Sequence, residues 1–194
     1  MARQFSCFFD SIEGDERNYV AEEFAQYFRA FFNDGVKELG DNLKVVANGT
    51  NMAVRIQPGT GVLQGYFYGL FDDGGGPLEL TLDAAGTQTR VDRIVLRLNR
   101  TTDVRSIVPT IIKGAAGGDA PAILRTDDLW DLSLAQITVP PGVSVLGPAH
   151  IFDERGDSAV CGIIEPYAVK QYLNQGVRTT DSPTFEKVIG AVYA

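Results

Sequence analysis

The stretch RVDRIVLRLNR, residues 90–100, surrounds an apolar run with four arginines. Two sets of side chains alternate along it: Ile94, Leu96 and Leu98 form one set, and Arg93, Val95 and Arg97 form the other. Successive side chains of a β-strand point to opposite faces of the sheet, so this period of two predicts a half-buried strand whose outer face carries arginine. That face is a nucleic-acid contact, a catalytic cluster, or a set of ion pairs.

The charge of the whole chain decides among these three. The 194 residues carry a formal net charge of −8, and an acidic surface repels phosphate backbones. Nucleic acid is therefore not expected as a partner. Asp92 lies among the arginines, and ion pairing explains the cluster without any ligand. We assign a role in ion pairs or in a subunit interface to Arg90, Asp92, Arg93 and Arg97.

The rest of the chain predicts a mainly β protein. Asn48-Gly49 favours a two-residue hairpin turn, and residues 107–113 are the expected partner of the arginine strand across a turn. Further strands are predicted at 61–71, with a bulge near Gly65, and at 78–82 and 129–139. No βαβ alternation occurs, so we predict an antiparallel β-sandwich-like domain in an α+β chain.

Two helices accompany these strands. Residues 18–35 have helical periodicity, with Asn18 as the expected cap and Gly35 at the end. This amphipathic helix is predicted to pack on the sheet and to bury its aromatic side chains, Phe24, Phe28 and Phe31. Residues 165–176 predict a short C-terminal helix, with Pro166 near its first turn.

Motifs of catalysis and metal binding are weak. His150 is the only histidine, and the HIFDE segment, residues 150–154, lacks the spacing of a zinc protease. Asp72 and Asp73 do not match a calcium loop. Cys7 and Cys161 predict buried free thiols. We therefore expect no catalytic residue, no cofactor and no metal.

The RGD tripeptide at 155–157 matches an adhesion motif, but a match of three residues is common by chance. The chain shows neither a signal-peptide pattern nor an apolar run of membrane-spanning length. It is accordingly expected to be made in a cytoplasm, without membrane insertion.

Five segments in order resemble the N-terminal region of the baseplate upper protein of lactococcal phages and its relatives, a family of baseplate and tail-fibre proteins in long-tailed phages of Gram-positive bacteria. They are FFDSIEGDERNYVAEEFAQYFRAFFNDGV (8–36), GYFYGLFD (65–72), RVDRIVLRLN (90–99), LSLAQITVPPGV (132–143) and IFDERGDSAVCG (151–162). The resemblance implies a globular baseplate-attachment domain over residues 1–164 and a short helix or linker over 165–176.

The last part of the chain carries a second resemblance. GVRTTDSPTFEKVIGAV, residues 176–192, is similar to short repeats of phage tail fibres. It implies that residues 177–194 begin a fibre or stalk, with a fibre-assembly segment made of Thr180, Asp181, Ser182, Pro183, Thr184 and Phe185.

Together the resemblances imply a virion structural protein that anchors host-recognition components to the tail tip. Its expected partners are further copies of itself, in a trimer, other baseplate or tail proteins, and a receptor-binding protein. The alternative is a carbohydrate-binding module that contacts the host cell wall directly, with Trp130, Tyr66 and Tyr68 as candidate platforms. A wall-degrading enzyme is a third hypothesis, for which the sequence offers no dense motif.

Overall fold

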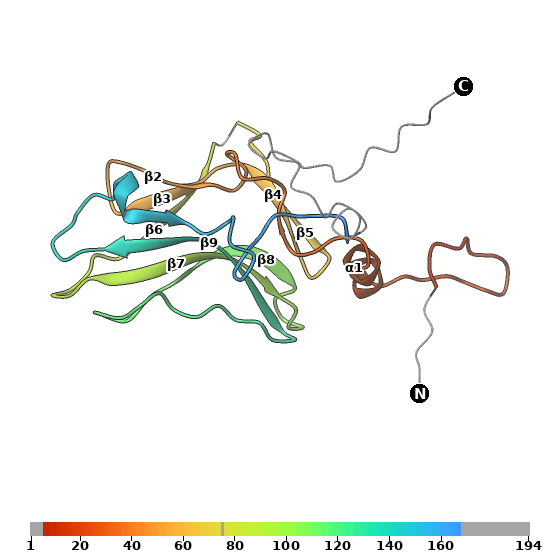
Figure 1. Cartoon of the computed structure of the whole chain (residues 1–194). Helices are drawn as coiled ribbons and strands as arrows, with labels where there is room; N and C mark the ends of the chain where they lie inside the picture. Colours follow the sequence, from red (N-terminus) through yellow and green to blue (C-terminus); the bar gives the residue numbers. More distant parts are fainter. Residues whose placement is uncertain (1–5, 75, 168–194) are drawn as a thin grey trace, which may run out of the picture.

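The computed structural model describes residues 6–74 and 76–167, and within these it is mainly β with three antiparallel sheets. The first sheet has the order β1 (Gly35–Val36), β4 (Gly59–Leu63), β5 (Tyr66–Leu70). The second has the order β10 (Ile151–Asp153), β9 (Leu129–Val139), β7 (Arg90–Asn99), β8 (Ser106–Ile112). The third has the order β2 (Val45–Ala47), β3 (Ala53–Ile56), β6 (Leu78–Thr81). Figure 1 shows how these strands lie together in the β domain.

The arginine strand β7 occupies the middle of the second sheet. It pairs antiparallel with β8, as predicted, and with β9 along its whole length. Its register with β9 shifts between Ile94 and Val95, where Leu134 is the extra residue. This bulge changes which side chains of β9 face the core: Leu132 and Leu134 do so before it, and Ala135 and Ile137 after it.

The segment 61–71 is a hairpin and not the single strand that the sequence predicted. Leu63 pairs with Tyr66, and the two residues between them form the turn. Gln64 has φ 51° and Gly65 has φ 78°, and positive φ at both positions is what a tight hairpin turn requires. The glycine therefore marks a chain reversal and not a bulge.

The predicted hairpin at Asn48-Gly49 is confirmed as an antiparallel pair of β2 and β3. Its connection is longer than the expected two residues, because β3 begins only at Ala53. The amide of Asn48 donates to the carbonyl of Ala53 across the loop (3.0 Å). The strand predicted at 78–82 corresponds to β6.

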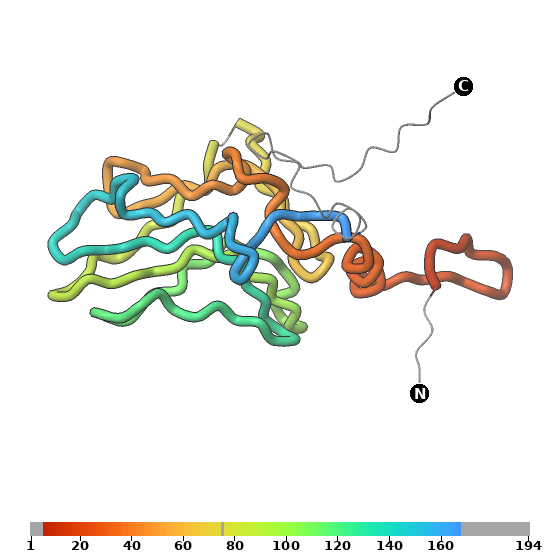
Figure 2. The backbone as a smooth tube through the Cα atoms, viewed as in Figure 1, coloured from red at the N-terminus to blue at the C-terminus, as the bar shows by residue number. Residues whose placement is uncertain are grey.

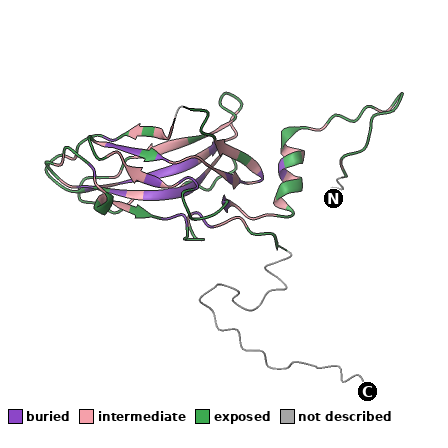
Figure 3. Cartoon of the chain, turned by 90° about the horizontal axis from the view of Figure 1, so that it is seen from above, coloured by how far each residue is buried: buried purple, intermediate pink, exposed green. Residues whose placement is uncertain are grey.

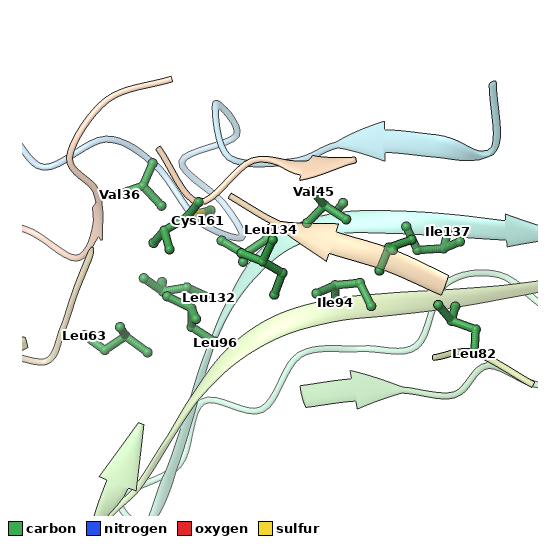
Figure 4. Close-up of a cluster of buried hydrophobic side chains, with 14 of the residues drawn as sticks. Val36, Val45, Leu63, Leu82, Ile94, Leu96, Leu132, Leu134, Ile137 and Cys161 are labelled. Atoms are coloured by element: carbon green, nitrogen blue, oxygen red, sulfur yellow. The ribbon is translucent and has the colours of Figure 1, made fainter. Parts of the chain in front are cut away.

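One hydrophobic core lies among the three sheets. It includes Val36 of β1, Leu63 of β4, Val54 of β3, Ile94 of β7 and Leu132 of β9. Figure 4 shows several of these side chains pointing toward one another from different strands. Burial of each such aliphatic side chain stabilises the fold by roughly 1.5–3 kcal/mol, so this cluster holds the strands in place.

The helix α1 spans only Ala21–Arg29, so the prediction of 18–35 was too long at both ends. Val20 and not Asn18 stands at its N-cap, where the Val20 amide donates to Glu23 Oε2 (3.0 Å). The helix lies beside one end of the sheets, and the preceding chain extends away from them (Figures 1 and 2). A 3₁₀ turn, η1 (Pro148–His150), precedes β10.

Candidate interaction surface

The helix α1 touches the β domain at the β4–β5 turn. Ala25 is its buried residue, only 2% exposed. The carbonyl of Ala25 lies so close to Gly65 that a Cβ added there would be 2.0 Å from its oxygen. Around this contact the Tyr66 hydroxyl donates to Glu22 Oε2 (2.9 Å), and Arg29 pairs with Glu22. One small residue and a few polar contacts thus hold the helix.

Phe24 and Phe28 of α1, and Phe31 just after it, are exposed. This corrects the prediction that they lie in the core. Phe24 is 41% exposed, Phe28 45% and Phe31 49%. Because the helix meets the hairpin through Ala25, much of its apolar stripe stays exposed. Phe28 also lines a small hollow with Val62 and Phe67 of the hairpin. Figure 3 shows how much of α1 is exposed. The periodicity identified an apolar stripe correctly but not what covers it.

The chain before α1, residues 6–20, continues this surface and is called the arm below. Phe8 packs edge-on against Tyr27 (4.7 Å between ring centroids) and lies 5.6 Å from Phe24. Farther out, Phe9 is 58% and Ile12 67% exposed. We define the aromatic surface as the exposed apolar side chains of the arm, of α1 and of the turn after it: Phe8, Phe9, Ile12, Val20, Phe24, Tyr27, Phe28 and Phe31. Large exposed apolar patches mark interaction sites.

Several hollows adjoin the aromatic surface. A groove of about 710 Å³ lies along the end of α1, where Phe28 and Phe31 face Tyr167. A second hollow of about 420 Å³ lies between the N-terminal end of α1 and the β7–β8 hairpin, and Arg100 and Arg105 line it. We call it the Arg100–Arg105 pocket; its apolar lining includes Tyr66, Phe67, Leu98 and Ile107.

The arginines of β7 make ion pairs within the chain. Arg90 Nε lies 2.7 Å from Asp92 Oδ1, and Arg90 Nη2 lies 2.8 Å from Asp92 Oδ2. Arg97 forms the same two-bonded contact with Asp131 on β9, at 2.8 and 2.9 Å. These carboxylates raise the pKa of both guanidinium groups through hydrogen bonds, against the opposing effect of burial.

Arg93 pairs with a carboxylate that follows β10. Its Nη2 donates to Glu154 Oε1 (3.1 Å), and its Nη1 donates to the Pro121 carbonyl (2.7 Å). Glu154 also accepts from the Ser133 hydroxyl and from the Gln136 amide at 2.6 Å. The sequence did not identify Asp131 and Glu154 as arginine partners, because they lie 34 and 61 residues from their arginines. Glu154 was considered only as part of the HIFDE segment.

The sequence predicted that the arginine-bearing face of β7 is open to solvent. In the structure this face is covered. The connection between β8 and β9 crosses it: the Leu124 amide donates to Asp131 (2.9 Å), and Arg93 beneath it donates to the Pro121 carbonyl (2.7 Å). Arg93 and Arg97 therefore fix this connection to the sheet, Arg97 through Asp131.

Arg90 and Asp92 lie on the other side of the sheet, because they pair opposite the core residues Val139 and Ile137. Arg90 donates to the carbonyls of Asp83 and Ala84, which precede β7.

The structure does not assemble the candidate site at HIFDE. Nδ1 of His150 accepts the Gly147 amide (2.9 Å), whereas Asp153 pairs with Arg155 and Glu154 with Arg93. Asp72 likewise serves a turn, because it accepts the amides of residues 74 and 76. No group of three potential metal ligands occurs among residues 6–74 and 76–167.

The two cysteines differ in burial. Cys161 is buried as predicted, and desolvation raises the pKa of its thiol to about 12. Cys7 is only partly buried, which corrects the expectation of two buried thiols. A thiol with so high a pKa is a poor nucleophile at neutral pH.

The RGD tripeptide is not presented for adhesion, because Arg155 is buried. Its guanidinium donates to Asp153 and to the carbonyls of Asn42 (2.6 Å) and Gly40 (3.2 Å). The arginine therefore joins the chain before β2 to the chain after β10.

The candidate sugar platforms are not free aromatic faces. Tyr66, Tyr68 and Trp130 are partly buried and pack against the core. Burial raises the pKa of both tyrosine hydroxyls, and the bond to Glu22 adds to the effect at Tyr66. The guanidinium of Arg125 lies 4.7 Å from the Trp130 ring centroid.

Comparison with known proteins gives this chain no relative: no protein-family model, no curated protein and no solved structure matches it. Two predicted segments, the helix at 165–176 beyond Tyr167 and the fibre-assembly residues 180–185, lie outside the described residues. Within the described part of the chain, no helix is both long and apolar enough to cross a membrane.

Proposed function

We propose that this chain is a structural protein of a phage tail baseplate or tail fibre, which anchors host-recognition components to the tail tip. In this proposal the three sheets form a sandwich-like attachment domain with α1 packed at its end. The chain forms a homotrimer, contacts other tail proteins, and carries a fibre or a receptor-binding protein beyond residue 176. It resides in the virion.

The exposed aromatic surface of the arm and α1 is the observation that carries this proposal. Eight large apolar side chains lie exposed on the arm, on α1 and just after it. Five of them are phenylalanines, which a monomeric protein would normally bury. A protein whose role is assembly has such a surface because another chain covers it. The five sequence segments that resemble the baseplate family give the assembly its proposed identity.

The arginine cluster supports the same role. Its ion pairs are used inside the sheet, where they fix the connection between β8 and β9. The cluster is thus explained without a ligand or a reaction.

Light scattering on residues 1–194, beside the same chain ending at Gly176, tests the proposal. A trimer of the full chain and a monomer of the shortened one would assign assembly to the C-terminal segment. Trimers of both would assign it to the β domain, the arm and α1. Monomers of both at concentrations near 100 µM would contradict a self-assembling structural protein.

A further inference from the structure

The Arg100–Arg105 pocket has the chemistry of a site for an apolar side chain flanked by negative charge. Leu98 and Ile107 line it, and Phe67 beside them is 63% exposed. Arg100 and Arg105 come from the loop that joins β7 to β8. Within the described part of the chain, neither guanidinium lies within 4.0 Å of a carboxylate, unlike the paired arginines of β7.

The arm has the complementary chemistry. Its residues 6–20 contain four carboxylates and a single arginine, and that arginine, Arg17, pairs with Asp15 inside the arm. Phe9 and Ile12 are exposed next to Asp10 and Glu13. An apolar side chain beside a free carboxylate suits an apolar pocket edged by free arginines.

The arm of a given chain points away from its own pocket. Phe8 is held against α1 by Tyr27 and Phe24, and the Phe9 amide donates to the Tyr19 hydroxyl (2.9 Å). From this base the arm extends beyond α1, on the side away from the sheets (Figures 1 and 3). Its outer residues are therefore placed to reach a neighbouring molecule.

We infer that the arm of one copy inserts Phe9 and Ile12 into the Arg100–Arg105 pocket of a second copy. Asp10 and Glu13 then meet Arg100 and Arg105. Each copy carries one arm and one pocket, so the contact is head-to-tail, and a ring closes when the rotation between neighbours allows it. The inference rests on the self-assembly in the proposed function and names the surface that would carry it.

The contact is tested with two variants of the full chain. The arm variant, Phe9→Ser with Ile12→Ser, removes the inserted side chains. The pocket variant, Arg100→Glu with Arg105→Glu, reverses the charge at the edge. Each alone should raise the dissociation constant of self-association by about tenfold or more in sedimentation velocity, as the loss of a central interface contact does.

Mixing the two variants separates a head-to-tail contact from a symmetric one. The pocket variant keeps an intact arm, and the arm variant keeps an intact pocket. An equimolar mixture should therefore form pairs at concentrations at which each variant alone remains monomeric. Phe152→Ser is the matched control, because Phe152 is 67% exposed on β10 and removing it should leave association unchanged.

Several outcomes would overturn the inference. If the arm variant associates like the unmodified chain, the arm is not the contact, although the proposed function stands. A mixture that forms no pairs would indicate a symmetric interface elsewhere. Hydrogen exchange at the pocket gives a further check. If the pocket is protected only when the arm is intact, and equally at every protein concentration, the arm binds the pocket of the same chain. A last outcome would make the pocket a sugar site. In that case tetra-N-acetylglucosamine would bind saturably to the unmodified chain but not to the pocket variant, and the arm variant would still associate.

Discussion

The backbone of Ala25 rests directly on Gly65, and this contact joins α1 to the β domain. A methyl group at Gly65 would meet the Ala25 carbonyl oxygen at 2.0 Å, and the φ of 78° is unfavourable for any residue with a side chain. The close seating of α1 on the β4–β5 turn therefore requires glycine at position 65, and the hydrogen bond from Tyr66 to Glu22 adds to this contact.

Gly65→Ala should loosen α1 from the β4–β5 turn. The backbone alone costs roughly 1–2 kcal/mol, and the clash adds to that. Gly49→Ala is the control, because Gly49 has φ 80° but no atom within 4 Å of the added Cβ. Hydrogen exchange of α1 should accelerate in the first variant only. Equal effects of the two substitutions would mean that the helix is not seated on Gly65.

The sequence predicted the pairing of β7 with β8 and the extent of β9, because alternation of apolar and polar residues is a local signal. The sequence of β9 also contains a signal of its bulge. In LSLAQITV, residues 132–139, the apolar positions change phase at Leu134 and Ala135, which is where the bulge lies. A strict period of two concealed that shift.

The exposure of the aromatic side chains of α1 could not be predicted from the sequence, for a physical reason. Hydrophobic periodicity gives the apolar side of a helix but not the element that covers it. Here the small residue Ala25 makes the contact, and Phe28 and Phe31 stay exposed. The partners Asp131 and Glu154 were missed for a related reason, since cross-strand pairs depend on register and not on spacing.

Asp131→Ala should destabilise the fold strongly. Asp131 is fully buried, and it accepts from Arg97 and from the Leu124 amide. Its removal leaves the Leu124 amide without its acceptor and the Arg97 guanidinium, whose side chain is 22% exposed, without its ion pair. Loss of such a partner costs about 1–3 kcal/mol. Asp83→Ala, which breaks an exposed pair with Lys113, should leave stability almost unchanged, because solvent screens exposed ion pairs. Urea unfolding measures both, and similar losses would contradict the covered face.

The raised pKa of the Cys161 thiol predicts that the fold loses stability at alkaline pH. Its folded pKa of about 12 lies above the unfolded value near 9, so the unfolded chain releases the proton first as pH rises. The contribution is complete below pH 9 and declines above it, by at most about 1.4 kcal/mol per pH unit. Cys161→Ala should flatten the dependence of unfolding free energy on pH between 8 and 10. An unchanged slope in the variant would show that other groups cause it.

The difference in burial between Cys7 and Cys161 predicts which thiol is labelled first. A disulfide reagent at pH 8 should modify the partly exposed Cys7 quickly and Cys161 only when the chain unfolds. Mass spectrometry after brief labelling should find one modified thiol per native chain and two in denaturant. Rapid modification of Cys161 in the native protein would mean that its site opens locally.

The aromatic surface predicts an unusual result for large-to-small substitution. Phe28→Ser and Phe31→Ser should each change the unfolding free energy of the monomer by only about 1 kcal/mol or less, because both side chains are already about half exposed. Leu132→Ala, in the core, should cost about 2–5 kcal/mol. Urea titration at low protein concentration isolates this effect from assembly. A large loss of unfolding free energy in the Phe28 or Phe31 variant of a monomer would mean that these side chains are buried in the core. A small loss would mean that another chain is needed to bury them.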